Sequence, residues 1–350
     1  MDPISQGAVG AATAQGLLPR SLLQPANLRV AALLGCLAGM APDLDVFISS
    51  PTDSLLFLEY HRQFTHALVF VPVGAAIVAA VAFPFVRRRL SFGVAWLVCL
   101  VGYGSHGLLD ACTSYGTQLF WPFSNHRVAW NNVAVVDPFF TLPLLVLLGI
   151  GVVRRSRRFT VAGLVWGLAY LGAGVVQNQR AEATGREMAA MRGHEPQRLG
   201  AKPGFANLLV WKVVYEHDGR YYIDAVRTGF RSTVCPGSSV PVLDIAEHLP
   251  WVDPASQQAQ DIERFRWFSS DYLTPDPVHP NRVIDARYSL VPNRIDPLWG
   301  IELAPDAPAN RHVLFVADRA ADAEEFAALG ALFSGEGCHG VESAAFAQGR

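Results

Sequence analysis

The chain has 350 residues, of which 51% are hydrophobic and only 17% are charged. An ordinary soluble protein has about a quarter charged residues, so this balance favours a membrane protein. The formal net charge of −2 gives no reason to expect a nucleic-acid partner, and the five cysteines include no Cys-x-x-Cys pair, so neither a zinc ribbon nor a disulfide framework is indicated.

The distribution of charge divides the chain. Up to about residue 180, charged residues form small clusters between apolar runs, whereas beyond it they are spread evenly. We therefore predict a transmembrane helical domain over residues 1–180, a linker over 181–200 that resembles a polar helix in part, and a soluble α+β domain over 201–350. The N-terminus has no basic residues before its apolar stretch, so no cleaved signal peptide is expected.

Five apolar segments are long enough, or nearly so, to cross a bilayer as helices, which takes about 20 residues. The first follows Arg29 and runs through VAALLGCLAGMAPDLD, and the others cover residues 67–86, 90–109, 138–153 and 159–179. The stretch 3–19 is rich in glycine and alanine, which suits a sixth, tightly packed helix, with a surface or disordered tail as the alternative.

Two arginine clusters, at 87–89 and 154–158, lie in short loops between these segments. The positive-inside rule places both clusters in the cytoplasm. The opposite ends of the spans, and the domain that follows the last span, are then expected outside. The predicted fold is an α-helical multi-pass bundle of five or six helices in a bacterial inner membrane, followed by a small extracytoplasmic α+β domain.

Histidines and aspartates gather at the predicted outer ends of the spans, in the motifs PDLD, HRQFTH, HGLLD and VVDPFF. They are Asp43, Asp45, His61, His66, His106, Asp110 and Asp137. At about 1.5 Å per residue, those on the spans lie roughly 21–26 Å from the arginines at the inner ends, and therefore at similar depth. Ionisable groups near a bilayer are costly unless they pair, bind a metal or line a watery cavity, so we predict one polar pocket.

The local spacing suggests how these side chains are presented. His106 and Asp110 are four residues apart and share one face of a helix. His61 is expected in a loop, with Thr65 capping the helix that carries His66.

The pocket offers nitrogen and oxygen donors and no thiolate, which suits zinc, manganese or iron better than calcium. We predict a divalent ion, with zinc or manganese preferred, bound by the seven residues. An aspartate not needed as a ligand, Asp45 or Asp137, is the expected catalytic general base.

The loop CTSYGTQLFWPFSNHRVAWNN (112–132) is rich in aromatic residues, as an interfacial aromatic belt would be. The alternative is a substrate-binding loop, because the planar fork of arginine suits phosphate oxygens. On that reading Arg62, His126, Arg127 and Trp130 contact an anionic headgroup or phosphate.

The segments MDPISQGAVGAA, GCLAGMAPDLD, YHRQFTHAL and the stretch from HGLLD to VVDPFF resemble the YdjM-type inner-membrane proteins, which are described as LexA-binding, membrane-associated, metal-dependent hydrolases. The resemblance covers roughly residues 1–180, and it implies that the seven residues named above bind metal. Many relatives have threonine and histidine where this chain has Ser5 and Gln6, which removes a ligand from the first helix. Nothing in these residues supports carrying over a LexA-binding activity.

In the C-terminal half, the Asp-Gly pair in HDGR (217–220) predicts a hairpin. NRVIDARYSLVPN and LWGIELAP predict further strands, and PASQQAQDIERFRWFS and ADAEEFAALGALF predict helices. A small domain on a mostly antiparallel sheet follows, which we expect to act as a lid or to present substrate. Cys235 and Cys338 would lie in an oxidising compartment, but the sequence leaves their pairing open.

These features predict a membrane-bound metal-dependent hydrolase with its site at the outer interface. The expected partners are membrane lipid and an amphiphilic substrate such as a lipid-linked phosphoester. Two alternatives remain: a non-catalytic scaffold braced by the metal, and an ion-handling membrane protein. The sequence leaves the oligomeric state open.

Overall fold

The computed structural model describes residues 1–318 and 322–345, and the chain divides into two compact units. The helical unit comprises Met1–Ile48, Tyr60–Val175 and Phe205–Asn207. The sheet unit comprises Ser49–Glu59, Val176–Gly204 and the residues from Leu208 onward.

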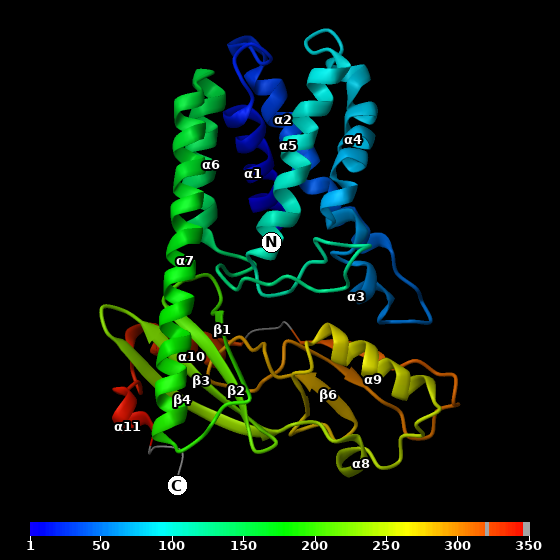
Figure 1. Cartoon of the computed structure of the whole chain (residues 1–350), viewed down its shortest axis with the longest axis vertical. Coiled ribbons are helices and arrows are strands. Elements are labelled where there is room, and N and C mark those ends of the chain that lie inside the picture. The colour runs from blue at the N-terminus through cyan, green and yellow to red at the C-terminus, as the bar shows by residue number, and fades with distance from the viewer. Residues whose placement is uncertain (319–321, 346–350) are drawn as a thin grey trace. The chain divides into compact units, whose positions relative to one another are not determined.

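The helical unit is a bundle of helices that Figure 1 shows side by side. Its long helices are α1 (Pro3–Leu17), α2 (Leu28–Met40), α4 (Val71–Val86), α5 (Phe92–Ala111), α6 (Pro138–Arg154) and the first part of α7 (Arg157–Met191). Short 3-10 helices connect or extend them: η1 (Pro25–Asn27), η2 (Ala41–Phe47), η3 (Phe64–His66) and η4 (Leu68–Phe70).

Among the described residues, four helical stretches are long and apolar enough to cross a membrane: Pro25–Phe47, Leu68–Val86, Phe92–Ala111 and Arg157–Met191. The shorter apolar helix α6 is the fifth predicted segment. The sequence therefore predicted the apolar helices of this half correctly. The glycine-rich N-terminal stretch is also a helix, α1, and most of its 15 residues are buried.

Glycine allows three helices of the bundle to approach closely. A Cβ atom on Gly10 of α1 would lie 2.3 Å from the carbonyl oxygen of Gly35 in α2, and one on Gly35 would lie 2.4 Å from the carbonyl oxygen of Gly10. A Cβ on Gly102 of α5 would lie 2.7 Å from the same Gly35 oxygen. Any larger side chain at Gly35 would therefore push on backbone that has little room to move.

The sheet unit contains two four-stranded antiparallel sheets, in the orders β1-β2-β3-β4 and β5-β6-β7-β8. The strands are β1 (Arg198–Pro203), β2 (Val210–His217), β3 (Arg220–Thr228), β4 (Ser232–Pro241), β5 (Leu273–Pro275), β6 (Arg282–Asp285), β7 (Trp299–Glu302) and β8 (Leu314–Ala317). The unit's helices, besides the end of α7, are α3 (Leu56–Tyr60), whose last residue belongs to the helical unit, α8 (Ile245–His248), α9 (Gln257–Phe268), α10 (Ala323–Ser334) and α11 (Val341–Ala345).

The predicted hairpin is confirmed. His217 pairs with Arg220, and the two residues between them, Asp218 and Gly219, have φ angles of 47° and 70°. Positive φ at both central positions is what a tight type I′ hairpin requires, and Asp-Gly adopts it readily.

The polar helix predicted within 181–200 is the end of α7, which continues as one helix to Met191, and β1 begins at Arg198. Ala181 and Met188 are fully buried and pack in one cluster with Trp211 of β2. Their spacing of seven residues places them on the same face of the helix. This apolar face covers the sheet, so the end of α7 is part of the sheet unit.

Residues Ser49–Glu59, which we call the tethered loop, also belong to the sheet unit. Arg264 of α9 contacts Asp53 at 2.8 Å and Glu59 at 2.5 Å. The Ser54 hydroxyl donates to the carbonyl oxygen of Val313 at 2.8 Å. The predicted boundaries put this loop in the membrane domain. The sequence could not show its attachment to the sheet unit, because ion pairs between residues so far apart leave no local pattern.

A disulfide joins Cys235 of β4 to Cys338, which answers the pairing question that the sequence left open. Next to it, Val234 forms an antiparallel bridge with His339, so the chain before α11 is fixed to the edge of the first sheet. The three cysteines of the helical unit are free thiols.

Candidate metal centre

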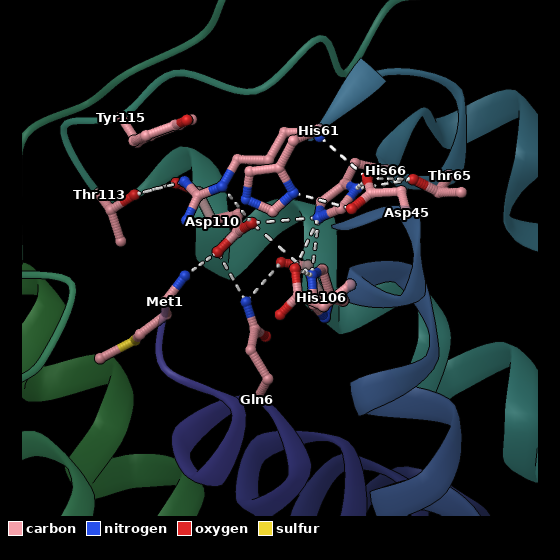
Figure 2. Close-up of polar contacts among 12 residues, drawn as sticks. Met1, Gln6, Asp45, His61, Thr65, His66, His106, Asp110, Thr113 and Tyr115 are labelled. Carbon is pink, nitrogen blue, oxygen red and sulfur yellow. Dashed lines mark hydrogen bonds and ion pairs between the residues drawn. The ribbon is translucent and has the colours of Figure 1, made fainter. Parts of the chain in front are cut away.

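Six of the seven predicted metal-binding residues lie together in the helical unit, in two groups that share Asp43. The first group is Asp43, His66, His106 and Asp110, and the second is Asp43, Asp45 and His61. Within each group one ligand atom per residue lies within 4.8 Å of the others. Figure 2 labels five of these side chains, which converge from η2, the turn before η3, η3 itself and α5: Asp45, His61, His66, His106 and Asp110.

The local structure explains how the donors reach one point. Helix α2 ends at Met40, and the tighter helix η2, with Pro42 in its first turn, carries the two aspartates. His106 and Asp110 lie one turn apart on α5, as predicted. The predicted cap by Thr65 is wrong: Gln63 precedes η3, and the Thr65 hydroxyl donates instead to Asp45 Oδ2 at 2.8 Å.

The first group has the dimensions of a tetrahedral ion site. The Nε2 atoms of His66 and His106 are 2.9 Å apart, and each lies 3.4 Å from Asp43 Oδ1. Asp110 Oδ2 lies 3.3 Å from His66 Nε2 and 3.6 Å from His106 Nε2. With metal–ligand bonds of about 2.0–2.1 Å, the ligand atoms of a tetrahedron are about 3.3–3.4 Å apart. The donor atoms therefore fit an ion of that size.

Hydrogen bonds on the far sides of the two imidazole rings determine which nitrogen carries the proton. His106 Nδ1 lies 2.6 Å from the carbonyl oxygen of Gly39, which can only accept, so Nδ1 donates. His66 Nδ1 lies 3.3 Å from Asp45 Oδ2 and 2.9 Å from Thr65 Oγ1, whose own proton goes to Asp45, so this Nδ1 also donates. In the neutral rings both Nε2 atoms then present lone pairs, and at 2.9 Å these two atoms need either a proton on one ring or a metal ion between them.

The carboxylates make the centre attractive to cations. Burial acts to lower the pKa of His66, but its hydrogen bonds with Asp110, Asp43 and Asp45 outweigh this effect and raise the pKa to about 10. The same negative charge that holds a proton on this ring would hold a divalent ion.

Asp110 is the most enclosed of the carboxylates. Its Oδ1 accepts a hydrogen bond from Gln6 Nε2 at 2.8 Å and also contacts the Met1 amino group (Figure 2). Its Oδ2 is buried and accepts no hydrogen bond of good geometry among the described residues, although Arg62 Nε lies 3.0 Å away. An orphaned carboxylate oxygen that faces two imidazoles is consistent with a metal ligand.

Asp45 has a different environment, because both of its oxygens are occupied. Oδ1 lies 2.8 Å from His61 Nδ1, while Oδ2 accepts from the Arg62 backbone N–H at 3.0 Å and from Thr65. Oδ2 also faces His66 Nδ1. This arrangement matches a carboxylate that orients metal-bound histidine, although Asp45 also belongs to the second group.

Asp137 is not in either group. Its Oδ1 accepts hydrogen bonds from the backbone N–H groups of Phe139 and Phe140 at the start of α6, at 3.0 and 3.3 Å. Its Oδ2 accepts from the Tyr170 hydroxyl at 2.8 Å. The structure thus shows Asp137 as the cap of α6, outside both groups of residues with which it shares a predicted metal-binding role, and its catalytic role stays a prediction.

Of the four predicted substrate-binding residues, two contact the same aromatic ring near the centre and two are exposed. The guanidinium groups of Arg62 and Arg127 both lie over the ring of Tyr115, at 4.7 and 5.5 Å from its centre. His126 and Trp130 are exposed on the same loop. Two arginines are thus brought together beside the carboxylate cluster, since Arg62 also contacts Asp110.

Sequence reasoning missed several residues of the centre. Thr113 accepts a hydrogen bond from Arg62 Nη1 at 3.0 Å. Its position three residues after Asp110, about one helical turn, could have indicated that it lies near the centre. The carbonyl group of Gly39 had no such signal, because a backbone acceptor is independent of residue type. Gln6 was named only as a poor ligand, yet it lies against Asp110.

Comparisons with known proteins identify the family of the chain. A family model described as "YdjM inner membrane protein" matches residues 1–181, which include the whole centre. The chain is 30% identical over 135 residues to "Uncharacterized protein YfhP" of Bacillus subtilis (strain 168), an alignment that covers 38% of this chain and 41% of that protein. No solved structure matches the chain. Because the family match covers more than half of its length, the chain belongs to the YdjM inner membrane protein family.

Proposed function

We propose that this protein is a metal-dependent hydrolase of the inner membrane, whose ion is held by Asp43, His66, His106 and Asp110. The observation that carries the proposal is the pair of imidazole Nε2 atoms, 2.9 Å apart and flanked by carboxylate oxygens. Two nitrogen and two oxygen donors suit zinc or manganese. Asp43 also belongs to the second group, but Asp45 and His61 of that group bond to each other at 2.8 Å, so the proposal places one ion, in the first group.

A divalent ion held there would supply Lewis-acid chemistry, which activates water and polarises a phosphoryl group. The chain's own residues would position the reaction. Asp45, predicted as the general base, has both oxygens occupied, so we assign the base to His61, whose Nδ1 it holds at 2.8 Å. Burial lowers the pKa of His61 even though its hydrogen bond with Asp45 acts to raise it, which favours the neutral ring that a base requires.

The pattern of exposure indicates where a substrate would enter. The side chains of His66, His106 and Asp110 are fully buried, whereas those of Asp43 and His61 are 20% and 17% exposed. A reacting group would therefore approach past Asp43 and His61. Arg62 and Arg127, whose guanidinium groups both lie over the ring of Tyr115, provide the positive charge that a phosphoester needs.

The proposed location is the outer face of the membrane, with the sheet unit outside the cytoplasm. The arginine clusters at 87–89 and 154–158 support this orientation by the positive-inside rule. The disulfide between Cys235 and Cys338 supports it independently, because such bonds persist in oxidising compartments. A site at this interface favours an amphiphilic phosphoester from the outer leaflet.

The test combines metal analysis with turnover. Detergent-purified protein should contain zinc or manganese, and His106→Ala and Asp110→Ala should each lower the bound metal after dialysis against a chelator. Metal-loaded protein in nanodiscs should hydrolyse at least one of a panel of lipid phosphoesters. Asp43→Asn and His66→Ala should reduce this rate about a hundredfold or more, the scale of lost catalytic electrostatics.

A metal-braced scaffold is the second candidate, favoured by the complete burial of His66, His106 and Asp110. A metal there would tie η2, η3 and α5 together without chemistry. Bound metal with no turnover on any phosphoester would support the scaffold and overturn the hydrolase proposal. Wild-type protein that binds no divalent metal would overturn both.

A further inference from the structure

The sheet unit carries an exposed aromatic and basic surface at the turn between β3 and β4. Phe230 is 109% exposed, and its neighbour Arg231 is also exposed. A single exposed aromatic side chain is common on protein surfaces, so it indicates a contact only where its place in the fold gives a further reason. The position of this turn along α7 indicates what that contact is.

Hydrogen bonds fix the turn to one level of α7. Gln177 Nε2 donates to the carbonyl oxygen of Thr228 at 2.9 Å. Arg180 Nη2 donates to the carbonyl oxygens of Gly229 at 2.6 Å and Phe230 at 3.4 Å. All of these residues belong to the sheet unit, so the level of the turn is set by α7 itself.

That level coincides with the end of the apolar part of α7. Residues 159–176 are uncharged and mostly apolar, and 18 residues of helix span about 27 Å, close to the roughly 30 Å of a hydrocarbon core. Gln177 and Arg180 follow within about one helical turn. If α7 crosses the bilayer with this stretch, then Phe230 lies among the lipid headgroups.

The charges on this surface are positive. Arg180 and Arg227 line a shallow hollow of about 560 Å³ together with Phe230, and Arg231 lies beside it. A Cβ on Gly229 would lie 3.2 Å from Arg227 Nη1, so this guanidinium is next to the turn. Within the part of the chain that the structure describes, none of the three arginines forms an ion pair with an acidic side chain.

We infer that the β3–β4 turn is a membrane-contacting surface, in which Phe230 inserts at the interface and the arginines bind anionic phospholipid headgroups. Aromatic side chains are favoured at the membrane interface, and arginine forms charge-assisted hydrogen bonds with phosphate. This surface would add a second attachment of the sheet unit to the bilayer, beside the covalent one through α7. The inference goes beyond the proposed hydrolase and does not depend on it.

The test uses the full-length protein in nanodiscs with a fluorescent label on a single introduced thiol, Phe230→Cys. The native thiols do not compete, because Cys36, Cys99 and Cys112 are half-buried or buried and the other two cysteines form the disulfide. A matched control is Asp218→Cys, on a side chain 85% exposed at the opposite end of β3. Nine residues of strand separate the two labels by roughly 30 Å.

Interfacial side chains lie about 5–10 Å into the headgroup and acyl boundary, so brominated lipid should quench most of the fluorescence at position 230 and little at 218. Quenching at 230 should be stronger with brominated phosphatidylglycerol than with brominated phosphatidylcholine. Arg231→Gln should reduce this preference about fivefold, the contribution of one arginine at an anionic surface. No quenching at 230, or equal quenching at both labels, would overturn the membrane contact and point to a protein partner. Equal quenching by the two lipids would overturn the role of the arginines.

Discussion

Substitution of Asp45 by asparagine tests whether this residue orients a metal-binding histidine or binds the metal itself. The change removes a charge and turns one oxygen into an N–H donor. At Oδ2 that donor would face Arg62 N, Thr65 Oγ1 and His66 Nδ1, whereas at Oδ1 it would face only His61. The amide nitrogen is therefore expected at Oδ1, where the His61 ring can change tautomer and accept.

The expected loss of metal affinity follows from one contact, between Asp45 Oδ2 and Nδ1 of the ligand His66. Loss of an orienting partner of a metal-bound histidine lowers metal affinity about 10–100-fold, or about 1.4–2.7 kcal/mol. In Asp45→Asn the remaining oxygen still faces His66 Nδ1, and Thr65 Oγ1 still contacts that nitrogen at 2.9 Å. We therefore expect the lower part of this range, about 10–30-fold.

The assay is competition for zinc between the purified protein and a chromophoric chelator. Asp137→Asn is the matched control, since it makes the same change in a buried carboxylate of the same unit that caps α6. It should lower thermal stability and leave zinc affinity unchanged. Unaltered affinity in Asp45→Asn would refute the orienting role, as would a loss of a thousandfold or more, which would make Asp45 a direct ligand. Equal losses in both variants would refute the assignment of Asp137 as a cap.

Three further outcomes are expected. Gly35→Ala should destabilise the bundle by about 1–3 kcal/mol in denaturant titrations, whereas Gly149→Ala, with nothing within 4 Å of its new Cβ, should be neutral or slightly stabilising. Burial lowers the pKa of Lys212 to about 7 from its ordinary 10.5, and it lowers the pKa of Lys202 to about 7 as well. Both are protonated in the unfolded state across this range, so the sheet unit loses stability as pH falls from 10.5 towards 7, and its apparent Tm should be higher at pH 10 than at pH 7. Lys212→Met should weaken this dependence, and the part due to Lys202 should remain. Cys338→Ser removes a crosslink to Cys235 across a sequence separation of 103 residues, which the chain-entropy model values at about 4.7 kcal/mol. The sheet unit should therefore melt at a lower temperature, and the protein should lose its mobility shift between reducing and non-reducing gels.

The apolar helices and most of the centre could be predicted because their signals are local. Uninterrupted apolar runs predict helices of membrane length, and charge at one end of each run predicts its depth. His106 and Asp110 could be paired from their spacing, since a regular helix connects them. The approach of His66 to His106 could be expected only from shared depth, because no short motif joins residues on different helices.

The features that the sequence did not predict depend on contacts with residues distant in the chain or with backbone groups. Asp137 has the same residue type and depth as the ligands, and only the N–H groups of α6 and the hydroxyl of Tyr170 distinguish it. The polar end of α7 resembled a linker because its apolar face is limited to a few positions such as Ala181 and Met188. Its helical conformation is stabilised by a sheet whose strands come later in the chain.

The tethered loop also imposes an order on the biosynthesis of the centre. It separates Asp45 from His61, and its ion-pair partner Arg264 follows Glu59 by 205 residues. At about 5–20 residues per second, a ribosome completes that interval in roughly 10–40 seconds. All the ligands, on η2, η3 and α5, are made well before this interval ends, while the loop between Asp45 and His61 still has no anchor. The metal site is therefore expected to reach its final geometry only after α9 has been translated and folded, which makes the C-terminal half a requirement for maturation of the N-terminal half.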